Sequence, residues 1–224
     1  MTFSIVARCV KTGQFGMAVA SSSPAVAARC AYARAGVGAA ASQNVTDPRL
    51  GPAALDQLAA GLDAGAALDA VIGAAEHIEH RQLLIVDRDG NTAIHSGGKS
   101  LGIHTEHAAR DVAAAGNLLA NDTIPRAMVE AFLSSEGHLG DRLITAMRGA
   151  LAAGGEAGPV HSAGMLLVDR QDWPLAELRC DWSEDCPIEN IAAAWDVYSP
   201  QMDDYVTRAL DPSAAPSYGV PGDE

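Results

Sequence analysis

The second residue of the chain could combine two chemical roles. Thr2 follows the initiator methionine, and the aminopeptidases that remove methionine generally act when the next residue is as small as threonine. The mature chain would then begin with a residue that carries both a hydroxyl group and a free α-amine. Because an α-amine titrates near pH ~7.7–8.0, it can take the hydroxyl proton at neutral pH. We therefore expect Thr2 to be a catalytic nucleophile.

The residues after Thr2 predict how such a nucleophile would be held. Residues 2–8 are rich in β-formers, residues 11–14 supply a turn, and residues 15–20 form a second apolar run. This pattern predicts a β-hairpin that fixes Thr2 at the leading end of a strand. Ser4 faces the same side of that strand and is a rival nucleophile, although it would need a separate base.

Polar residues at the ends of other predicted strands could complete the site. Gln43 ends a predicted third strand with Asn44 beside it, and Asn117 ends a later one. Gln43 and Asn117 are candidate donors to an oxyanion, and Asn44 is a candidate substrate ligand. Ser21 could bond the terminal amine. The alternatives are that the asparagines are ordinary turn residues and that Ser21 caps a helix.

Other groups of reactive residues predict no second chemistry. The sequence has His-x-x-His at residues 77–80 and 104–107, a spacing that could place two metal ligands on one helix face, but neither pair has an evident third ligand. We therefore expect no metal site. The four cysteines contain no CxxC pair, and Cys9 and Cys30 are expected to be buried packing residues rather than thiol nucleophiles.

Composition limits the partners of the chain. Its 224 residues, 48% hydrophobic and 19% charged, are enough for one sizeable domain, and its formal net charge is −13. Such an acidic chain would be repelled by nucleic acid and by anionic membrane surfaces. No apolar run is long enough for a membrane helix, and the first residues lack the pattern of a signal peptide. We expect a cytoplasmic protein.

The order of the predicted elements indicates the fold class. After the first hairpin we expect a short helix to about residue 33, a strand at 35–43, two helices within 47–76, strands at 82–86, 92–95 and 111–116, helices at 125–133 and 139–152, and strands at 162–168 and 175–180. Antiparallel strands grouped between pairs of helices predict an α+β protein: a four-layer αββα sandwich of two antiparallel sheets.

The opening segments resemble a known class of hydrolases. The hairpin resembles the start of proteasome-type β-subunits, in which the catalytic threonine leads. Over essentially its whole length the chain more closely resembles a bacterial family of unknown function, DUF1028, grouped with the N-terminal-nucleophile (Ntn) hydrolases. The segments that carry these resemblances are residues 2–8, 12–13, 16–21, 33–39, 116–120 and 200–206. The resemblance implies an Ntn-like fold and hydrolysis of a small amide substrate without a cofactor.

The cations near the expected site differ from those of the proteasome-type pattern. Those sites place a lysine beside the threonine, whereas Lys11 lies in a predicted turn and Lys99 in a predicted loop. Arg29 and Arg34 lie between the second and third predicted strands. Because an arginine does not deprotonate, we expect them to bind a substrate carboxylate rather than to transfer protons.

The C-terminal quarter has a distinct composition. Residues 171–224 carry 12 of the 28 acidic residues but only 2 of the 15 basic ones. We expect an Ntn-hydrolase-like domain over 1–186 and an acidic helical segment with an irregular tail over 187–224. The aromatic residues concentrated there, including Trp173, Trp182 and Trp195, predict a docking surface and a homo-oligomer, most simply a dimer. The alternative function is a catalytically silent small-molecule-binding protein with the same fold.

Overall fold

Two antiparallel sheets form the centre of the molecule in a computed structural model that describes residues 1–222. The six-stranded sheet has the order β10-β9-β2-β1-β8-β7 and the four-stranded sheet the order β3-β4-β5-β6. The strands are β1 (Thr2–Arg8), β2 (Phe15–Ser21), β3 (Ala31–Arg34), β4 (Gly38–Asn44), β5 (Arg81–Asp87), β6 (Thr92–Ser96), β7 (Thr105–Ala109), β8 (Val112–Asn117), β9 (Ser162–Val168) and β10 (Ala176–Cys180).

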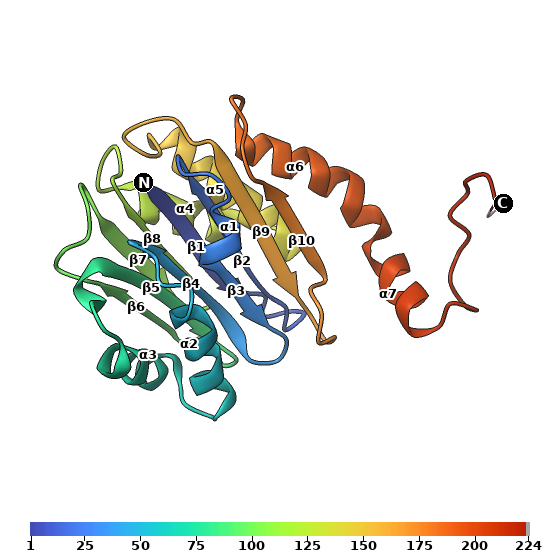
Figure 1. The fold of residues 1–224 in the computed structure, drawn as a ribbon. Helices are drawn as coiled ribbons and strands as arrows, with labels where there is room; N and C mark the ends of the chain where they lie inside the picture. Colours follow the sequence, from blue (N-terminus) through green and yellow to red (C-terminus); the bar gives the residue numbers. More distant parts are fainter. Residues whose placement is uncertain (223–224) are drawn as a thin grey trace.

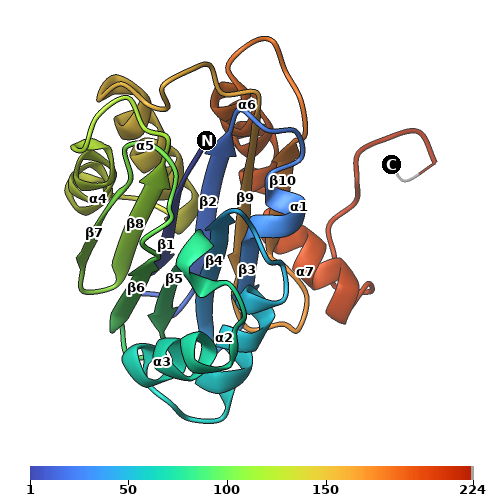
Figure 2. The ribbon, with the colours of Figure 1, turned by 60° about the vertical axis from the view of Figure 1, so that its left-hand side comes forward.

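Helices cover the outer face of each sheet, as Figures 1 and 2 show. On the six-stranded sheet lie α4 (Ile124–Ser134), α5 (Leu139–Ala152) and α6 (Pro187–Tyr198); on the four-stranded sheet lie α2 (Leu50–Ala59) and α3 (Ala64–Ala74). The shorter elements are α1 (Ala27–Cys30), η1 (Ile78–His80), η2 (Ser199–Gln201) and α7 (Met202–Leu210). The predicted αββα sandwich is confirmed.

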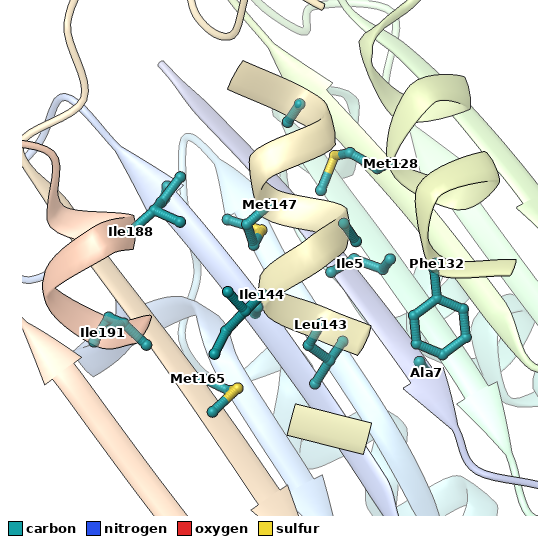
Figure 3. Packing of buried hydrophobic residues seen from close by; sticks show 14 of the residues in the cluster. Ile5, Ala7, Met128, Phe132, Leu143, Ile144, Met147, Met165, Ile188 and Ile191 are labelled. Atoms are coloured by element: carbon teal, nitrogen blue, oxygen red, sulfur yellow. The ribbon is translucent and has the colours of Figure 1, made fainter. Parts of the chain in front are cut away.

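Alternation along β1 divides its side chains between two layers. Phe3 and Ile5 belong to the cluster beneath α4 and α5, whereas Val6 belongs to the cluster between the sheets. Figure 3 shows Leu143 and Met147 of α5 in the outer cluster. Fully burying side chains of this size stabilises the fold by about 1.5–3 kcal/mol each, so β1 is fixed from both sides.

Two elements differ from the sequence-based expectation. The helix predicted to about residue 33 stops at Cys30, and residues 31–34 form β3, because pairing with β4 outweighs the helix propensity of alanine. Strand β7 was not predicted at all. Its residues are polar and half-exposed at the edge of the sheet, so they carry no apolar alternation that would reveal a strand.

The C-terminal segment joins the core before it leaves the sandwich. Ile188, Ile191 and Trp195 of α6 are buried, and the Trp195 ring nitrogen donates to Asp141 Oδ1 at 2.7 Å. The expectation that the aromatic residues here form a docking surface is therefore wrong for Trp195. Met202 at the start of α7 also belongs to the core cluster, with Val206 packed against it, and in Figure 1 residues 211–222 extend away from the sheets. The domain boundary after residue 186 stays a prediction, and residues 223–224 of the expected tail lie outside the described residues.

Within residues 1–222, no helix combines the length and apolar character that crossing a bilayer requires.

Candidate active site

Thr2 is the first residue of a strand in the middle of the six-stranded sheet. It is 7% exposed and lies opposite Asn117 of β8, while β2 pairs with the other edge of β1. Because Thr2, Ser4 and Val6 alternate with the residues beneath α4 and α5, the Thr2 side chain faces the four-stranded sheet. The structure places Thr2 at the end of β1, as predicted, and its hydroxyl is enclosed rather than in bulk solvent.

Two hydroxyl groups meet the carbonyl oxygen of Met1. The Thr2 hydroxyl donates to it at 2.5 Å, and the Ser21 hydroxyl donates to the same oxygen. The two side-chain oxygens are 3.3 Å apart, and the Ser23 backbone N–H donates to Ser21 Oγ at 3.1 Å. Ser21 therefore lies beside Thr2 and is bonded to the carbonyl that precedes it, while its bond to the terminal amine stays a prediction.

The layer between the sheets changes from apolar to polar at this end of the molecule. Farther along the strands it contains Val6, Met17, Leu84 and other buried apolar residues. At the Thr2 end, strand register aligns polar residues in one row on each sheet. These rows are Ser162, Ser21, Thr2 and Asn117 on the six-stranded sheet and Gln43, Gln82 and Ser96 on the other.

A series of hydrogen bonds, here called the polar chain, crosses between the two sheets. Ser4 donates to Gln43 Oε1 at 2.6 Å, and Gln43 Nε2 donates to Gln82 Oε1 at 3.1 Å. Gln82 Nε2 donates to Ser96 Oγ at 3.0 Å, and Ser96 donates to Glu106 Oε2 at 2.5 Å. Because Ser4 and Glu106 lie in one sheet and the other three residues in the second, the polar chain ties the sheets together below Thr2.

The two predicted oxyanion donors, Gln43 and Asn117, differ in how many amide protons are already used. Both amide protons of Gln43 are used, one on Gln82 and the other on the Ala115 carbonyl at 3.2 Å. Gln43 is fully buried, so it positions its neighbours and has no proton left for an oxyanion. Asn117 Nδ2 donates one proton to Gln82 Oε1 at 3.1 Å, which leaves its second proton for another acceptor.

Asn44 contributes backbone geometry near the site. Its φ is +72°, its Nδ2 donates to the His80 carbonyl at 2.5 Å, and its Oδ1 accepts the Leu101 N–H at 3.2 Å. A left-handed asparagine bonded on both sides fixes the turn after β4. Both polar atoms of the Asn44 side chain are thus bonded to backbone groups. The role of Asn44 in substrate binding stays a prediction.

The structure does not bring the two predicted arginines to this cluster. Arg34 pairs in register with Gly38, at the opposite end of β4 from Gln43, and its guanidinium forms an exposed ion pair with Asp56 at 2.8 Å. Arg29 donates to the backbone carbonyls of Pro24 and Ala25 on the exposed side of α1. Their predicted contact with a substrate carboxylate has no support in this arrangement.

Glu156, a buried carboxyl near the N-terminus, was not predicted from the sequence. Glu156 is 5% exposed, and its Oε2 accepts the Ser22 N–H at 3.1 Å. Burial raises the pKa of Glu156 to about 7, although the positive charge of the terminal amine and the bonds from Ser22 act to lower it. A glutamate just after a glycine-terminated helix carries no sequence signal, since only the fold brings residues 22 and 156 together.

The remaining candidate groups lie elsewhere. His77 has a φ of +57° and precedes the short helix η1, and residues 105–107 belong to strand β7. Neither His-x-x-His pair therefore lies within an α-helix that would place both rings on one face. Among residues 1–222, no group of three or more His, Cys, Asp or Glu side chains could hold a metal ion. Cys9 and Cys30 are buried free thiols, and Cys180 and Cys186 are half-buried free thiols.

A solved crystal structure shares this fold. A crystal structure of a DUF1028 protein from Silicibacter pomeroyi is similar at a TM-score of 0.82 and 29% identity, covering 88% of this chain and 89% of that chain. Anbu (ancestral beta-subunit) from Yersinia bercovieri matches at a TM-score of 0.40 and 11% identity, covering 97% of this chain and 100% of the other. No curated protein matches the chain. The model of the family of unknown function DUF1028 matches residues 2–191, so the chain belongs to the DUF1028 family.

Proposed function

We propose that the protein is an Ntn-type amidohydrolase that cleaves a small amide through Thr2 after removal of Met1. One observation carries the proposal: at the Thr2 end, both sheets replace their apolar inward-facing residues with polar ones, around the first hydroxyl of the chain. Burying so many polar groups is costly unless they are bonded, and such clusters are typical of functional sites. A purely structural layer could have continued the apolar packing.

The reaction would use groups that already surround Thr2. The free amine of Thr2 takes the hydroxyl proton as Oγ1 bonds to the substrate carbonyl carbon. The Ser21 hydroxyl and the free amide proton of Asn117 are the donors proposed for the oxyanion. The substrate nitrogen leaves with a proton, and water then hydrolyses the ester on Thr2 with the same amine as its base.

The position of Met1 indicates where the acyl group of a substrate would lie. The Met1 carbonyl already accepts from both Thr2 and Ser21, so an amide carbonyl can be bound beside the nucleophile. A Cβ added to Gly158 would lie 3.1 Å from Met1 Cε, so the glycine accommodates the methionine side chain. We infer that, after processing, this space accepts a small acyl group.

The same contacts support a second candidate function. If Met1 is retained, its carbonyl engages both hydroxyls and Thr2 has no free amine. The chain would then be a catalytically silent protein that binds small molecules in the same fold. The two functions differ in the state of the N-terminus.

Intact mass spectrometry and one pair of variants test the proposal. The purified chain is expected to lack Met1 and to release p-nitroaniline from members of a panel of small acyl p-nitroanilides. Thr2→Ala keeps a small second residue, so processing continues while the nucleophile is lost, and we expect release to fall at least 100-fold. Thr207→Ala, on exposed α7, is the matched control and should leave the rate unchanged. Retained Met1 would support the silent function instead, whereas full activity in Thr2→Ala would contradict Thr2 as the nucleophile.

The exposed apolar residues of the C-terminal segment support the proposal of a homo-oligomer. Val197 near the end of α6 is 67% exposed, and Leu210 at the end of α7 is 59% exposed. Light scattering is expected to give a dimer for the full chain and a monomer for a chain that ends at residue 198. A monomer in both cases would contradict the proposal.

A further inference from the structure

Glu156 is held in an arrangement that packing alone does not explain. Its backbone is fixed beside the segment that follows Asn117: Glu156 forms a β-bridge with Leu119, and the Ala157 N–H donates to the Leu118 carbonyl at 3.0 Å. Its carboxyl is almost completely buried, and Oε1 has no hydrogen-bond partner among the described residues. An unpartnered buried carboxylate oxygen is costly unless another group offsets this cost.

The terminal amine is the charged group that acts on this carboxyl. Burial raises the pKa of Glu156 to about 7, and the field of the amine opposes that rise. The Ser22 N–H adds a bond to Oε2. The nearest histidine along the chain, His161, directs Nδ1 to the Ser183 carbonyl and stacks on Trp182. Among the groups that act on the Glu156 carboxyl, the terminal amine is therefore the cation.

The end of β2 links this carboxyl to the proposed nucleophile. Ser21 Oγ is 3.3 Å from Thr2 Oγ1, and the next residue, Ser22, donates its N–H to Glu156. Removal of Met1 transfers the α-amine to Thr2, a displacement of about 3.8 Å along the backbone. The carboxyl, the new amine and the hydroxyl would then occupy one enclosed space.

We propose that Glu156 is the proton-accepting partner of the Thr2 amine, an assignment that rests on the proposed role of Thr2 as nucleophile. The carboxylate pairs with the ammonium form of the amine and orients it beside the hydroxyl. The ammonium then gives one proton to the carboxylate, which leaves a neutral amine and a carboxylic acid. The neutral amine takes the hydroxyl proton as Oγ1 bonds to the acyl carbon, and its ammonium form protonates the leaving nitrogen as the carbon–nitrogen bond breaks. Glu156 returns its proton to the amine at the end of the cycle.

The energetic match between the two groups supports this exchange. A free α-amine titrates near ~7.7–8.0, close to the value at which Glu156 titrates in the fold. Because the two pKa values are close, the main cost of the proton transfer is the loss of the ion-pair attraction. A solvated glutamate with a pKa of 4.5 would be a poorer proton acceptor by about 2.5 pKa units.

The test measures the Thr2 amine directly and needs no substrate. Periodate cleaves the Cα–Cβ bond of an N-terminal threonine only when its amine is free and unprotonated, and mass spectrometry detects the resulting glyoxylyl group. The rate of oxidation is followed against pH in the wild type and in Glu156→Gln, which keeps the shape and an acceptor for the Ser22 N–H. Glu177→Gln, on the exposed face of β10, is the matched control with the same charge change.

An opposite charge within about 4–6 Å raises the pKa of an amine by about 1–3 units. The midpoint of oxidation is therefore expected to fall by at least one pH unit in Glu156→Gln and to stay unchanged in Glu177→Gln. Glu156→Asp, which keeps the charge, should retain most of the wild-type midpoint. If the glutamine variant does not fold, carbon-13 NMR of the wild-type Glu156 carboxyl gives the same answer, because acetylation of the terminal amine should shift its midpoint.

The outcomes separate the two proposals. A processed chain whose oxidation midpoint is the same in wild type and Glu156→Gln, or a carboxyl resonance that ignores acetylation, overturns the role of Glu156 alone. A chain that keeps Met1 overturns both proposals. A shifted midpoint in a chain without amidase activity supports the ion pair but contradicts the proposed proton transfer in catalysis.

Discussion

Replacing Gln82 with methionine removes the centre of the polar chain while keeping a side chain of similar length. Gln82 Oε1 accepts from Gln43 and Asn117, both at 3.1 Å, and Gln82 Nε2 donates to Ser96 at 3.0 Å and to the Gly116 carbonyl at 3.1 Å. Four buried or part-buried bonds at about 1 kcal/mol each predict a loss of about 4 kcal/mol in the free energy of unfolding. Gln43 and Asn117 are buried, which favours the full loss.

Urea unfolding followed by circular dichroism measures this change, with the slope expected to stay constant so that only the midpoint moves. Gln201→Met is the control, since Gln201 is exposed and donates only to the Val197 carbonyl. That variant should change stability by less than about 0.5 kcal/mol. If Gln82→Met costs no more than the control, the polar chain does not hold the sheets together and the reasoning fails.

Two further predictions concern packing and pH. A Cβ on Gly140 would lie 2.5 Å from the Trp195 ring, so Gly140→Ala should lower the free energy of unfolding by about 1–3 kcal/mol. Gly73 lies at an exposed position of α3 with open space around it, so Gly73→Ala should raise the free energy of unfolding by about 0.5–1 kcal/mol. Equal melting temperatures of the two variants would contradict both predictions. Glu156 titrates at about 7 in the fold against 4.5 in the unfolded chain, so the folded state binds the extra proton and stability is lost as the pH rises through that window. Relative to wild type, Glu156→Gln should therefore become more stable by about 3 kcal/mol between pH 4.5 and pH 8, and a constant difference across that range would refute the buried titration.

The strands and helices that carry strong patterns could be predicted from the sequence. Residues 82–86 form a nearly continuous apolar run before an Asp-Gly turn, and the helices α4 and α5 have clear apolar stripes, so their type and order followed directly. Strand β7 could not be predicted, because an edge strand of polar residues resembles a loop until its partner is known. Strand β3 required knowledge of its pairing with β4.

The candidate site was predictable only where it coincided with a strand end. Thr2, Ser21 and Asn117 each end a recognisable strand, and register then aligned them. Arg34 also ends a strand, β3, but its pairing with Gly38 places it at the opposite end of the four-stranded sheet from Gln43. Glu156 reaches the site through a long-range bridge that no local pattern encodes.

The polar chain also gives the interior a direction. Every proton in it points from Ser4 toward Glu106, whose carboxylate can only accept. No single amide can therefore be turned over without breaking a bond on each side, so the series behaves as one aligned row of dipoles anchored by a surface charge. Protonating Glu106, or replacing it with glutamine, would remove this fixed acceptor, so the hydrogen bonds could also run in the reverse direction. Glu106 lies in β7, two strands away from the strand that begins with Thr2.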